Sequence, residues 1–511
     1  MWLDRLGRFA EFTGSSSAIM IRHDKWAPRA AQEERLRRLE HQIAHCQVTI
    51  EVEIERAALL SALDRRAEAQ QAFVDILLRA PTNFSALNEF GACLTAMGLI
   101  AAACRVYSEA IIHHRKNPIG HVNLANLLLR RGNLSGAREH YEAALRLDPN
   151  HPQAHQGLGA VHSALGDHRS AKPYFQNGFS NHFISTLPYR GTKPPIPLLL
   201  LVSSGSGNIP TASFLDDRIF AISVIVADFL DAAIPLPAHK VVFNGIGDAD
   251  LCNPALEAAA RFAKTASAPV INTPSAVIRT GRASNAQRLR ALPGVVTPRT
   301  VIIPRAILTG PKAGVTLSAD GFLFPLLLRS PGFHTGHHFV FVDSATELPG
   351  VAAGLPGDNL FVIEYLDARG ADGNSRKYRV MIVDGRIYPM HLAISRQWKV
   401  HYFTADMTDS ADHRSEDAAF LANMPAVLGQ KAMTSLERIA EQLNLDYCGI
   451  DFGLSPDGDV LLFEANATMV VNLPDSDERW DYRRPAVAKI LSAVSNMILD
   501  RAAPGRKNNV A

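Results

Sequence analysis

A period of 34 residues runs through the first part of the chain and constrains its fold more than any other feature. Small residues recur at this spacing, as do alanines and aromatic residues. The three series are Ala57, Gly91, Ala125 and Gly159; Ala69, Ala103, Ala137 and Ala171; and Phe73, Tyr107, Tyr141 and Phe175. A fourth series, Asp64, Gly98, Gly132 and Gly166, marks one turn in every copy. A period of this length predicts an array of units that each pack only on their neighbours.

Each unit is predicted to be a pair of helices. Two helices approach closely only where small residues lie at their contact, and an aromatic ring then fills the space beside the next helix. Glycine permits the turn between the helices, and Pro81 and Pro149 fall where a unit ends. The pattern resembles the tetratricopeptide repeat over residues 50–183. Residues 1–49 are expected to be an N-terminal segment, loosely ordered at first and ending in a capping helix over residues 32–47.

The resemblance to tetratricopeptide repeats implies a concave surface that binds extended peptide or protein segments. Polar residues on the first helices of the units, where they would hold a peptide backbone, are Asn88, Asn123, Asn126 and Arg130. The alternative is that the array forms a homo-oligomer or packs on the following domain. His151 and His155 have the spacing of a metal pair on one helix, but we expect surface or capping roles because no cysteine or carboxylate completes the set.

The character of the chain changes after His182. Residues 184–196 are rich in proline and are predicted to be a linker. Residues 197–300 alternate apolar runs with predicted helices at about 212–232 and 254–266. Such alternation predicts a parallel α/β subdomain.

The remaining chain, residues 301–500, mixes hairpins with helices and is followed by a tail over residues 501–511. One hairpin turns at Asp384-Gly385 and another at residues 456–458. Helices are predicted at about residues 424–443 and 484–499.

The second hairpin carries three oxygen-bearing side chains within apolar runs. Glu464 and Asn466 differ by two positions, so both point to the same face of a sheet, and the partner strand brings Asp451 close to them. Such oxygen ligands suit Mg²⁺, whereas zinc prefers histidine or cysteine. Burying Glu464 beside Phe463 without a cation would cost several kcal/mol. The hairpin therefore predicts a metal site.

The motifs of this region follow one another in a family-specific order. They are FPLLLRSPGFHTGHHF, FVIEYLD, KYRVMIVDGRIY, YCGIDF and LFEANAT. Over about residues 197–500 the chain resembles ATP-grasp enzymes, in particular ligases of the glutathione synthetase and ribosomal-protein glutamate ligase type and D-alanine–D-alanine ligase. The fold expected for the whole chain is an α-helical solenoid followed by an α/β (α+β) ATP-grasp fold with a preceding parallel α/β subdomain.

The resemblance implies roles for individual residues, with ATP and Mg²⁺ as cofactors. The implied Mg²⁺ ligands are Asp451, Glu464 and Asn466. The implied nucleotide-binding residues are Arg282, Arg329, His334, Gly336, Glu364, Tyr365 and Leu366. The implied catalytic residues are Arg329, Arg379 and Arg396. The expected substrate contacts are Asn244, Asp248, Arg396, Lys399 and His401. Arg282 and Arg329 stand where the family usually has lysine, and arginine binds phosphate with a permanent charge.

The implied reaction is carboxylate–amine ligation. A carboxylate takes the γ-phosphoryl group of ATP to form an acylphosphate and ADP, and an amine then displaces phosphate to give an amide. The repeat array would recruit a peptide or protein substrate. Two alternatives remain open: a repeat-based adaptor whose ATP-grasp half binds nucleotide without turnover, and a small-molecule ligase whose repeats serve oligomerisation.

Composition indicates which partners and which cellular location to expect. With 52 Lys and Arg against 50 Asp and Glu, the net charge is +2, and no nucleic-acid or membrane partner is expected. Five widely spaced cysteines without a CxxC motif argue against disulfides or structural zinc and favour a cytoplasmic location. The chain has neither a signal-peptide pattern at its start nor an unbroken apolar run of about 18 residues.

Overall fold

The computed structural model describes residues 29–231, 233–333, 336–400 and 405–503. The chain forms two compact units. Unit 1 comprises Met1–Leu200 and Leu215–His239, and unit 2 comprises Leu201–Phe214 and Lys240–Ala511. No helix within the described ranges has both the length and the apolar character needed to cross a lipid bilayer.

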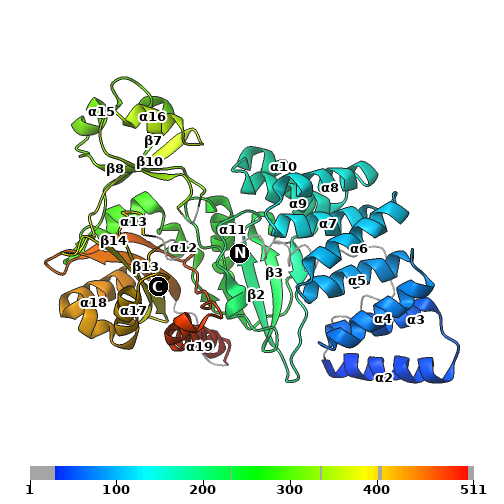
Figure 1. The fold of residues 1–511 in the computed structure, drawn as a ribbon. Helices are drawn as coiled ribbons and strands as arrows, with labels where there is room; N and C mark the ends of the chain where they lie inside the picture. The colour runs from blue at the N-terminus through cyan, green and yellow to red at the C-terminus, as the bar shows by residue number, and fades with distance from the viewer. Residues whose placement is uncertain (1–28, 232, 334–335, 401–404, 504–511) are drawn as a thin grey trace. The chain divides into compact units, whose positions relative to one another are not determined.

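Unit 1 begins with a succession of helices that pack in sequence order (Figure 1). They are α2 (Arg29–His45), α3 (Ile50–Ala62), α4 (Arg66–Arg79), α5 (Phe84–Ala96), α6 (Ile100–His113), α7 (Pro118–Arg130), α8 (Leu134–Leu147), α9 (Pro152–Ala164) and α10 (His168–Phe179). The predicted array of helix pairs is therefore confirmed, and α2 occupies the place of the predicted capping helix.

The small residues of the repeat lie where neighbouring helices touch. A Cβ atom added to Gly91 would lie 2.5 Å from the ring of Tyr107, and one added to Gly159 would lie 2.5 Å from the ring of Phe175. A Cβ atom added to Gly157, two residues before Gly159, would lie still closer to the ring of Tyr141. The turn residues all have positive φ: 67° at Asp64, 77° at Gly98, 74° at Gly132 and 79° at Gly166. The pairing of small residues with aromatic rings, and the turn in every copy, are as the period predicts.

All three asparagines expected on a peptide-binding surface make contacts within the array. Asn126 is 4% exposed, and its Oδ1 accepts a hydrogen bond of 2.5 Å from the Tyr141 hydroxyl. The expectation that Asn126 holds a peptide is therefore wrong, because its side chain lies inside the helix interface. Asn123 Nδ2 donates to Asn88 Oδ1 at 2.7 Å, which joins α5 to α7.

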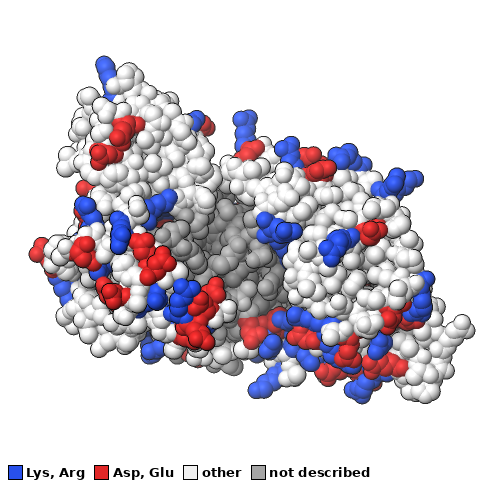
Figure 2. Space-filling view, in the orientation of Figure 1, with Lys and Arg blue, Asp and Glu red and all other residues white. Residues whose placement is uncertain are grey.

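Ion pairs join the first helices of the array. Arg35 of α2 pairs with Glu55 of α3 at 2.7 Å, and Arg79 of α4 pairs with Glu53 of α3. Figure 2 shows the corresponding mixture of positive and negative side chains over α2 to α4. These contacts are largely exposed, so each adds little to stability.

Unit 1 ends in strands. β1 (Ile184–Thr186) pairs with β3 (Phe220–Val226) in antiparallel register, and β2 (Ile196–Val202) has its residues up to Leu200 in this unit. The helix predicted at 212–232 is wrong: this segment contains a short 3₁₀ turn, η1 (Thr211–Ser213), then β3, then a second 3₁₀ turn, η2 (Ala227–Phe229). The run FAISVIV is rich in β-branched residues and almost wholly buried, so it shows no helical period and favours a strand.

Unit 2 opens with a parallel strand pair. β4 (Val241–Asn244) and β5 (Val270–Ile271) pair in parallel, and α11 (Asn253–Ala263) connects them, as the alternating pattern predicts. Gly245, directly after β4, donates its backbone N–H to Leu201 at the end of β2. The segment continues through α12 (Pro274–Ile278), α13 (Arg282–Leu289) and β6 (Val295–Val296).

A small antiparallel sheet follows, with strand order β7-β10-β8-β9 (Figure 1). Its elements are β7 (Thr300–Pro304), α14 (Arg305–Leu308), α15 (Ala313–Ala319), β8 (Leu326–Arg329), β9 (Phe339–Val342), α16 (Leu348–Ala353) and β10 (Asn359–Glu364). Alternate strand residues face opposite sides. One side packs on the helices through Leu328, Val342 and Leu360. The other side carries an apolar cluster of Leu327, Phe339, Phe341, Phe361, Ile363, Tyr365 and Trp398.

A large sheet completes unit 2, with strand order β12-β11-β13-β14-β6. Its elements are β11 (Ser375–Val383), β12 (Arg386–Ser395), α17 (Ala411–Ala422), α18 (Met424–Leu443), β13 (Tyr447–Leu454), β14 (Val460–Asn466), η4 (Glu478–Arg483) and α19 (Arg484–Ala502). Both predicted hairpins and both predicted helices are confirmed. Tyr378 and Phe452, paired across β11 and β13, stack on each other, and Phe420 of α17 meets Tyr378 edge-on. The helices therefore cover one face of this sheet, and the residues next to Tyr378 and Phe452 point to the other.

The contact between Gly157 and Tyr141 generates a first prediction. Gly157→Ala is expected to lower the free energy of unfolding by about 1–3 kcal/mol, because the added methyl group overlaps the ring. This loss would appear although alanine favours a helix by about 1 kcal/mol. Urea denaturation followed by circular dichroism measures it. Gly350→Ala in α16 is the control, since a Cβ there meets no atom within 4 Å; equal stability of the two variants would contradict the tight contact.

A histidine pair between α7 and α8 generates a second prediction. The Nδ1 atoms of His121 and His140 lie 3.0 Å apart, and burial lowers the pKa of both imidazoles. In the folded protein both imidazoles have a pKa below the ordinary value of 6.5, so they take up protons less readily than in the unfolded chain. The fold is therefore most stable above pH 6.5, where the rings are neutral in both states, and it loses stability as the pH falls. The melting temperature should therefore fall more steeply between about pH 7 and pH 5 in the wild type than in His121→Gln/His140→Gln. The exposed His168→Gln should keep the wild-type slope, and an unaltered slope in the double variant would refute the effect.

Candidate active site

Four side chains form a row across one face of the large sheet. The strand register pairs His391 of β12 with Arg379 of β11, Arg379 with Asp451 of β13, and Asp451 with Glu464 of β14. Directly paired residues place their side chains on the same face. The sequence predicts that Asp451 and Glu464 lie close together, and the register places them on neighbouring strands.

Asp451 is held by two cations of β11. It is 2% exposed, and its carboxylate accepts from Arg379 Nε at 2.5 Å and from Arg379 Nη2 at 2.7 Å. Lys377 Nζ lies 3.2 Å from Asp451 Oδ2. Burial acts to raise the pKa of Asp451, but the charges of Arg379 and Lys377 outweigh it and hold the pKa well below its usual range. Sequence reasoning missed Lys377, although it lies two residues before Arg379 on the same strand face.

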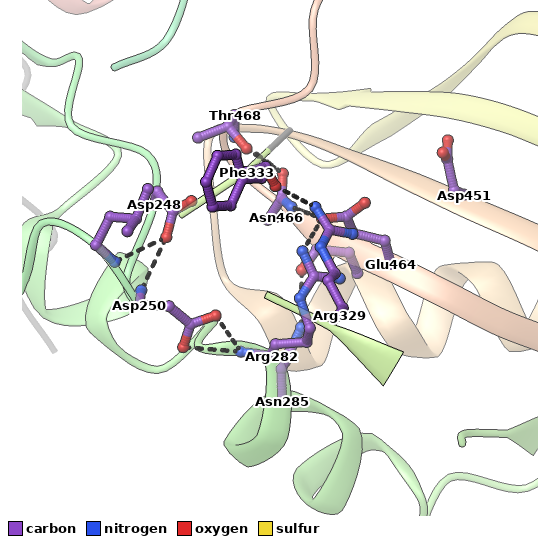
Figure 3. A network of polar contacts seen from close by, with 12 residues as sticks. Asp248, Asp250, Arg282, Asn285, Arg329, Phe333, Asp451, Glu464, Asn466 and Thr468 are labelled. Atoms are coloured by element: carbon purple, nitrogen blue, oxygen red, sulfur yellow. Dashed lines mark hydrogen bonds and ion pairs between the residues drawn. The ribbon is translucent and has the colours of Figure 1, made fainter. Parts of the chain in front are cut away.

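Glu464 is held in turn by Arg282 of α13 and by Asn466 of its own strand, as Figure 3 shows. Arg282, at the start of α13, donates from Nη2 to Glu464 Oε1 at 2.7 Å, and Asn466 Nδ2 donates to the same oxygen at 2.9 Å. Burial opposes ionisation of Glu464, yet Arg282 and then Arg329 lower its pKa to about 2. Glu464 is therefore a stable carboxylate between two arginines.

Arg329, the last residue of β8, is the contribution of the small sheet to this site. It is 9% exposed, and its Nη2 donates to the carbonyl of Phe333 at 2.7 Å. Its guanidinium carbon lies 5.5 Å from the centre of the Phe339 ring. Burial, and then the like charge of Arg282, lower the pKa of Arg329 to about 10. Two arginines thus converge near one carboxylate, and each keeps its charge at neutral pH.

A cavity beside Glu464 contains further polar groups. Its lining includes Asp248, Asp250, Arg282, Asn285 and Asn466. The Asp250 carboxylate accepts from the backbone N–H of Arg282 at 3.0 Å, and burial raises its pKa. Asp248, which the sequence analysis singled out, shares this cavity with Glu464. The sequence analysis missed Asp250, which lies two residues after Asp248, and Asn285, which lies three residues after Arg282.

Comparison with known proteins finds one matching family model and several solved structures similar to parts of the chain. Residues 125–166 match the family model described as TPR repeat. No curated protein matches its sequence.

Solved structures similar to the chain fall into two groups. MamA residues 41 to the end from Desulfovibrio magneticus RS-1 is 22% identical, with 34% of this chain and 93% of that chain covered and a TM-score of 0.27. A RimK domain ATP-grasp protein from Sphaerobacter thermophilus is 15% identical, covering 59% and 99%, with a TM-score of 0.36. The ATP-grasp ligase PsnB, complexed with a precursor variant, Mg and ADP, is 14% identical, covering 60% and 99%, with a TM-score of 0.35.

Several residues expected at the ATP-grasp site make other contacts. Asn244 is fully buried, and its amide donates to the carbonyl of Asn272 at 2.9 Å, so it holds β4 to the end of β5 and does not line the cavity. One carboxylate oxygen of Glu364 accepts from the backbone N–H of Arg299 at 3.0 Å. Tyr365 meets the Phe341 ring edge-on at 5.2 Å, and Leu366 follows it directly.

The residues after β12 also differ from expectation. The Arg396 side chain is exposed, and its backbone N–H donates to Asp406 Oδ2 at 2.9 Å. Lys399 donates to the backbone carbonyls of Gly336 and Phe339, so its ammonium is occupied by the protein. His334 and His401 lie outside the described residues.

The donors around Glu464 fit Mg²⁺ by chemical type, since Asp451, Glu464 and Asn466 offer oxygen atoms only. Their present partners are cations and hydrogen-bond donors: Asn466 Oδ1 accepts from the backbone and hydroxyl of Thr468. Within the described ranges, no three His, Cys, Asp or Glu side chains are grouped closely enough to hold a metal ion. A bound cation would therefore exchange places with arginine contacts.

The buried pair of Arg379 and Asp451 generates a third prediction. Arg379→Ala leaves a buried carboxylate with only part of its compensation, and should lower the free energy of unfolding by about 3 kcal/mol. Arg379→Ala/Asp451→Ala should lose less than the sum of the single variants, by about 1 kcal/mol or more. Guanidinium denaturation measures both.

The exposed pair of Arg479 and Asp477 supplies a matched control for that experiment. Arg479→Ala should change stability by about 0.5 kcal/mol or less. Strict additivity of the Arg379 and Asp451 variants would show that the two side chains are not coupled.

Proposed function

We propose that the chain is an ATP-dependent carboxylate–amine ligase. The observation that supports this most directly is the buried Asp451–Glu464 pair on adjacent strands, surrounded by Lys377, Arg379, Arg282 and Arg329. Four cations stand beside the two carboxylates of this pair, with Asp248 and Asp250 in the adjoining cavity, and arginines so placed suit the oxygens of a phosphate group. A polyphosphate bound with Mg²⁺ supplies them.

In this proposal the two sides of the site act on different charges. Arg282 and Arg329 would hold phosphoryl oxygens, and Asp451, Glu464 and Asn466 would hold Mg²⁺, which would supply positive charge to the transferred phosphoryl group. Arg379, paired with Asp451, would place a positive charge beside the transferred phosphoryl group. The reaction then needs positioning and electrostatic stabilisation and no side-chain nucleophile.

The repeat array has the role of recruiting a peptide or protein substrate in this proposal. Tetratricopeptide arrays bind through the surface that their first helices share. The Asn123–Asn88 hydrogen bond lies between two such helices, and its polar groups are partly buried rather than enclosed. These side chains offer amide groups to a peptide backbone.

A repeat-based adaptor without turnover is the second candidate. It is favoured by one observation: both oxygens of Asp451 are engaged by Arg379 and Lys377, so that a metal must compete with them. An adaptor would bind MgADP and MgATP with similar affinity and release no phosphate.

Glu464→Gln gives the decisive test of the enzyme proposal. The wild type, incubated with ATP, Mg²⁺ and pools of carboxylates, amines and peptides, should release ADP and phosphate, and the variant should be slower by about 10²–10³-fold because a charge at the metal site is lost. Coupled assays for ADP and for phosphate measure both products. Release of AMP and pyrophosphate would rule out the acylphosphate route.

The control replaces a glutamate outside the site. Glu437→Gln on the exposed surface of α18 should keep full activity. Nucleotide binding with no product from any pool, or equal function of Glu464→Gln and wild type, would favour the adaptor.

A further inference from the structure

The segment Arg396–Val400, called the strap below, leaves the large sheet after β12 and contacts the small sheet. The ring centre of Trp398 lies 5.5 Å from that of Phe339 at 70°, and 5.4 Å from that of Phe341. Both phenylalanines belong to β9 and to the apolar cluster on the side of the small sheet opposite its helices. The strap therefore ties two sheets together through an aromatic contact.

Lys399 adds a polar contact at the same place. Its ammonium donates to the carbonyl of Phe339 at 3.2 Å and to the carbonyl of Gly336. Gly336 has φ of 75°, and a Cβ atom added there would lie 2.7 Å from Lys399 Cε. The lysine thus lies against the glycine turn and holds the backbone at both ends of Gly336–Phe339. Burial, and then the charge of Arg329, lower the pKa of Lys399.

The base of the strap is anchored on the large-sheet side by one carboxylate. Asp406 Oδ2 accepts from the backbone N–H of Arg396 at 2.9 Å and from the Ser395 hydroxyl at 3.3 Å. The backbone N–H of Asp406 donates to Ile394 of β12 at 3.1 Å. Trp398 and Lys399 are therefore presented from a fixed support.

Phe339 connects the strap with the candidate active site. Its ring packs against Trp398 and also lies beneath the guanidinium of Arg329, 5.5 Å from the ring centre. Its carbonyl is held by Lys399. A cation over an aromatic face is stabilised by the ring electrons, and the direction of the ring then influences the direction of the guanidinium.

We propose that the strap positions Arg329: Trp398 fixes the Phe339 ring on which the guanidinium lies, and Lys399 fixes the backbone of the Gly336–Phe339 segment. Trp398 and Lys399 are positioning residues in this scheme and make no contact with the ligand through their own charges. The inference rests on the proposed function and deepens it, since it gives a positioning role to Lys399, which was expected to contact substrate.

A double-mutant cycle tests the proposal on the full chain with MgADP as the probe. By isothermal titration calorimetry, Trp398→Leu should weaken MgADP binding about fivefold or more, because Arg329 loses its preferred direction. Arg329→Ala should weaken it at least as much. Trp398→Leu/Arg329→Ala should be no weaker than Arg329→Ala alone, since the strap acts through that arginine. Losses that multiply in the double variant would overturn the proposal.

The lysine provides a second arm with matched controls. Lys399→Met should weaken MgADP binding in the same way, and Lys399→Arg should restore part of it. Lys489→Met, on the exposed side of α19, and Trp480→Phe should bind like the wild type. Unchanged binding in both Trp398→Leu and Lys399→Met, with Arg329→Ala impaired, would remove the strap from nucleotide binding.

A measurement without ligand separates this proposal from the proposed function. Acrylamide quenching of Trp398 fluorescence is isolated as the difference from Trp398→Phe. The quenching should rise by about twofold in Lys399→Met, because Phe339, on which Trp398 packs, is then no longer held by Lys399. If the wild type did not bind MgADP, the nucleotide proposal would fail, and the quenching would still decide on the strap. Equal quenching in wild type and Lys399→Met would overturn the strap.

Discussion

The ion pair between Arg379 and Asp451 is the interaction on which the architecture of unit 2 most depends. It places two opposite charges in the middle of the large sheet, on strands that pair in register, where neither charge could remain alone. The neighbours continue the pattern: Glu464 stands next to Asp451 on β14 and pairs with Arg282. Asp250 then accepts from the backbone N–H of Arg282 in the adjoining cavity. Each buried charge of this site therefore lies beside a charge of opposite sign.

The sequence predicts the helical array and the hairpins well because both follow local rules. Gly98 and Asp384-Gly385 mark turns by their backbone conformation, and the 34-residue period repeats the same helix contact. The failure at residues 212–232 has a physical cause: β3 is buried at all but one of its residues, so it lacks the alternation that would identify a strand. Apolar runs of this kind are decided by tertiary contacts.

The site was predicted less completely than the fold. Acids embedded in apolar runs identify Asp451 and Glu464, since such burial calls for compensation. Lys377 and Asp250 carry no comparable signal, because a charged residue near a turn or strand end is usually solvated. Asn244 shows the opposite error, because a structural residue was predicted to bind substrate. Its side-chain amide donates to the backbone carbonyl of Asn272.

The left-handed conformation of Asp64 has a consequence for how unit 1 comes apart. In the other copies the same turn is made by glycine, which adopts φ near 75° without strain, whereas a residue with a Cβ atom gives up about 1–2 kcal/mol there. In a one-dimensional array, opening begins at the end where a unit has fewer neighbours and weaker internal contacts. The strained turn lies in the first repeat, next to α2, which packs on the array through Leu36 and Leu39 and through ion pairs with α3. Opening of the array should therefore travel from its amino end, and the later repeats should be the last to lose their order.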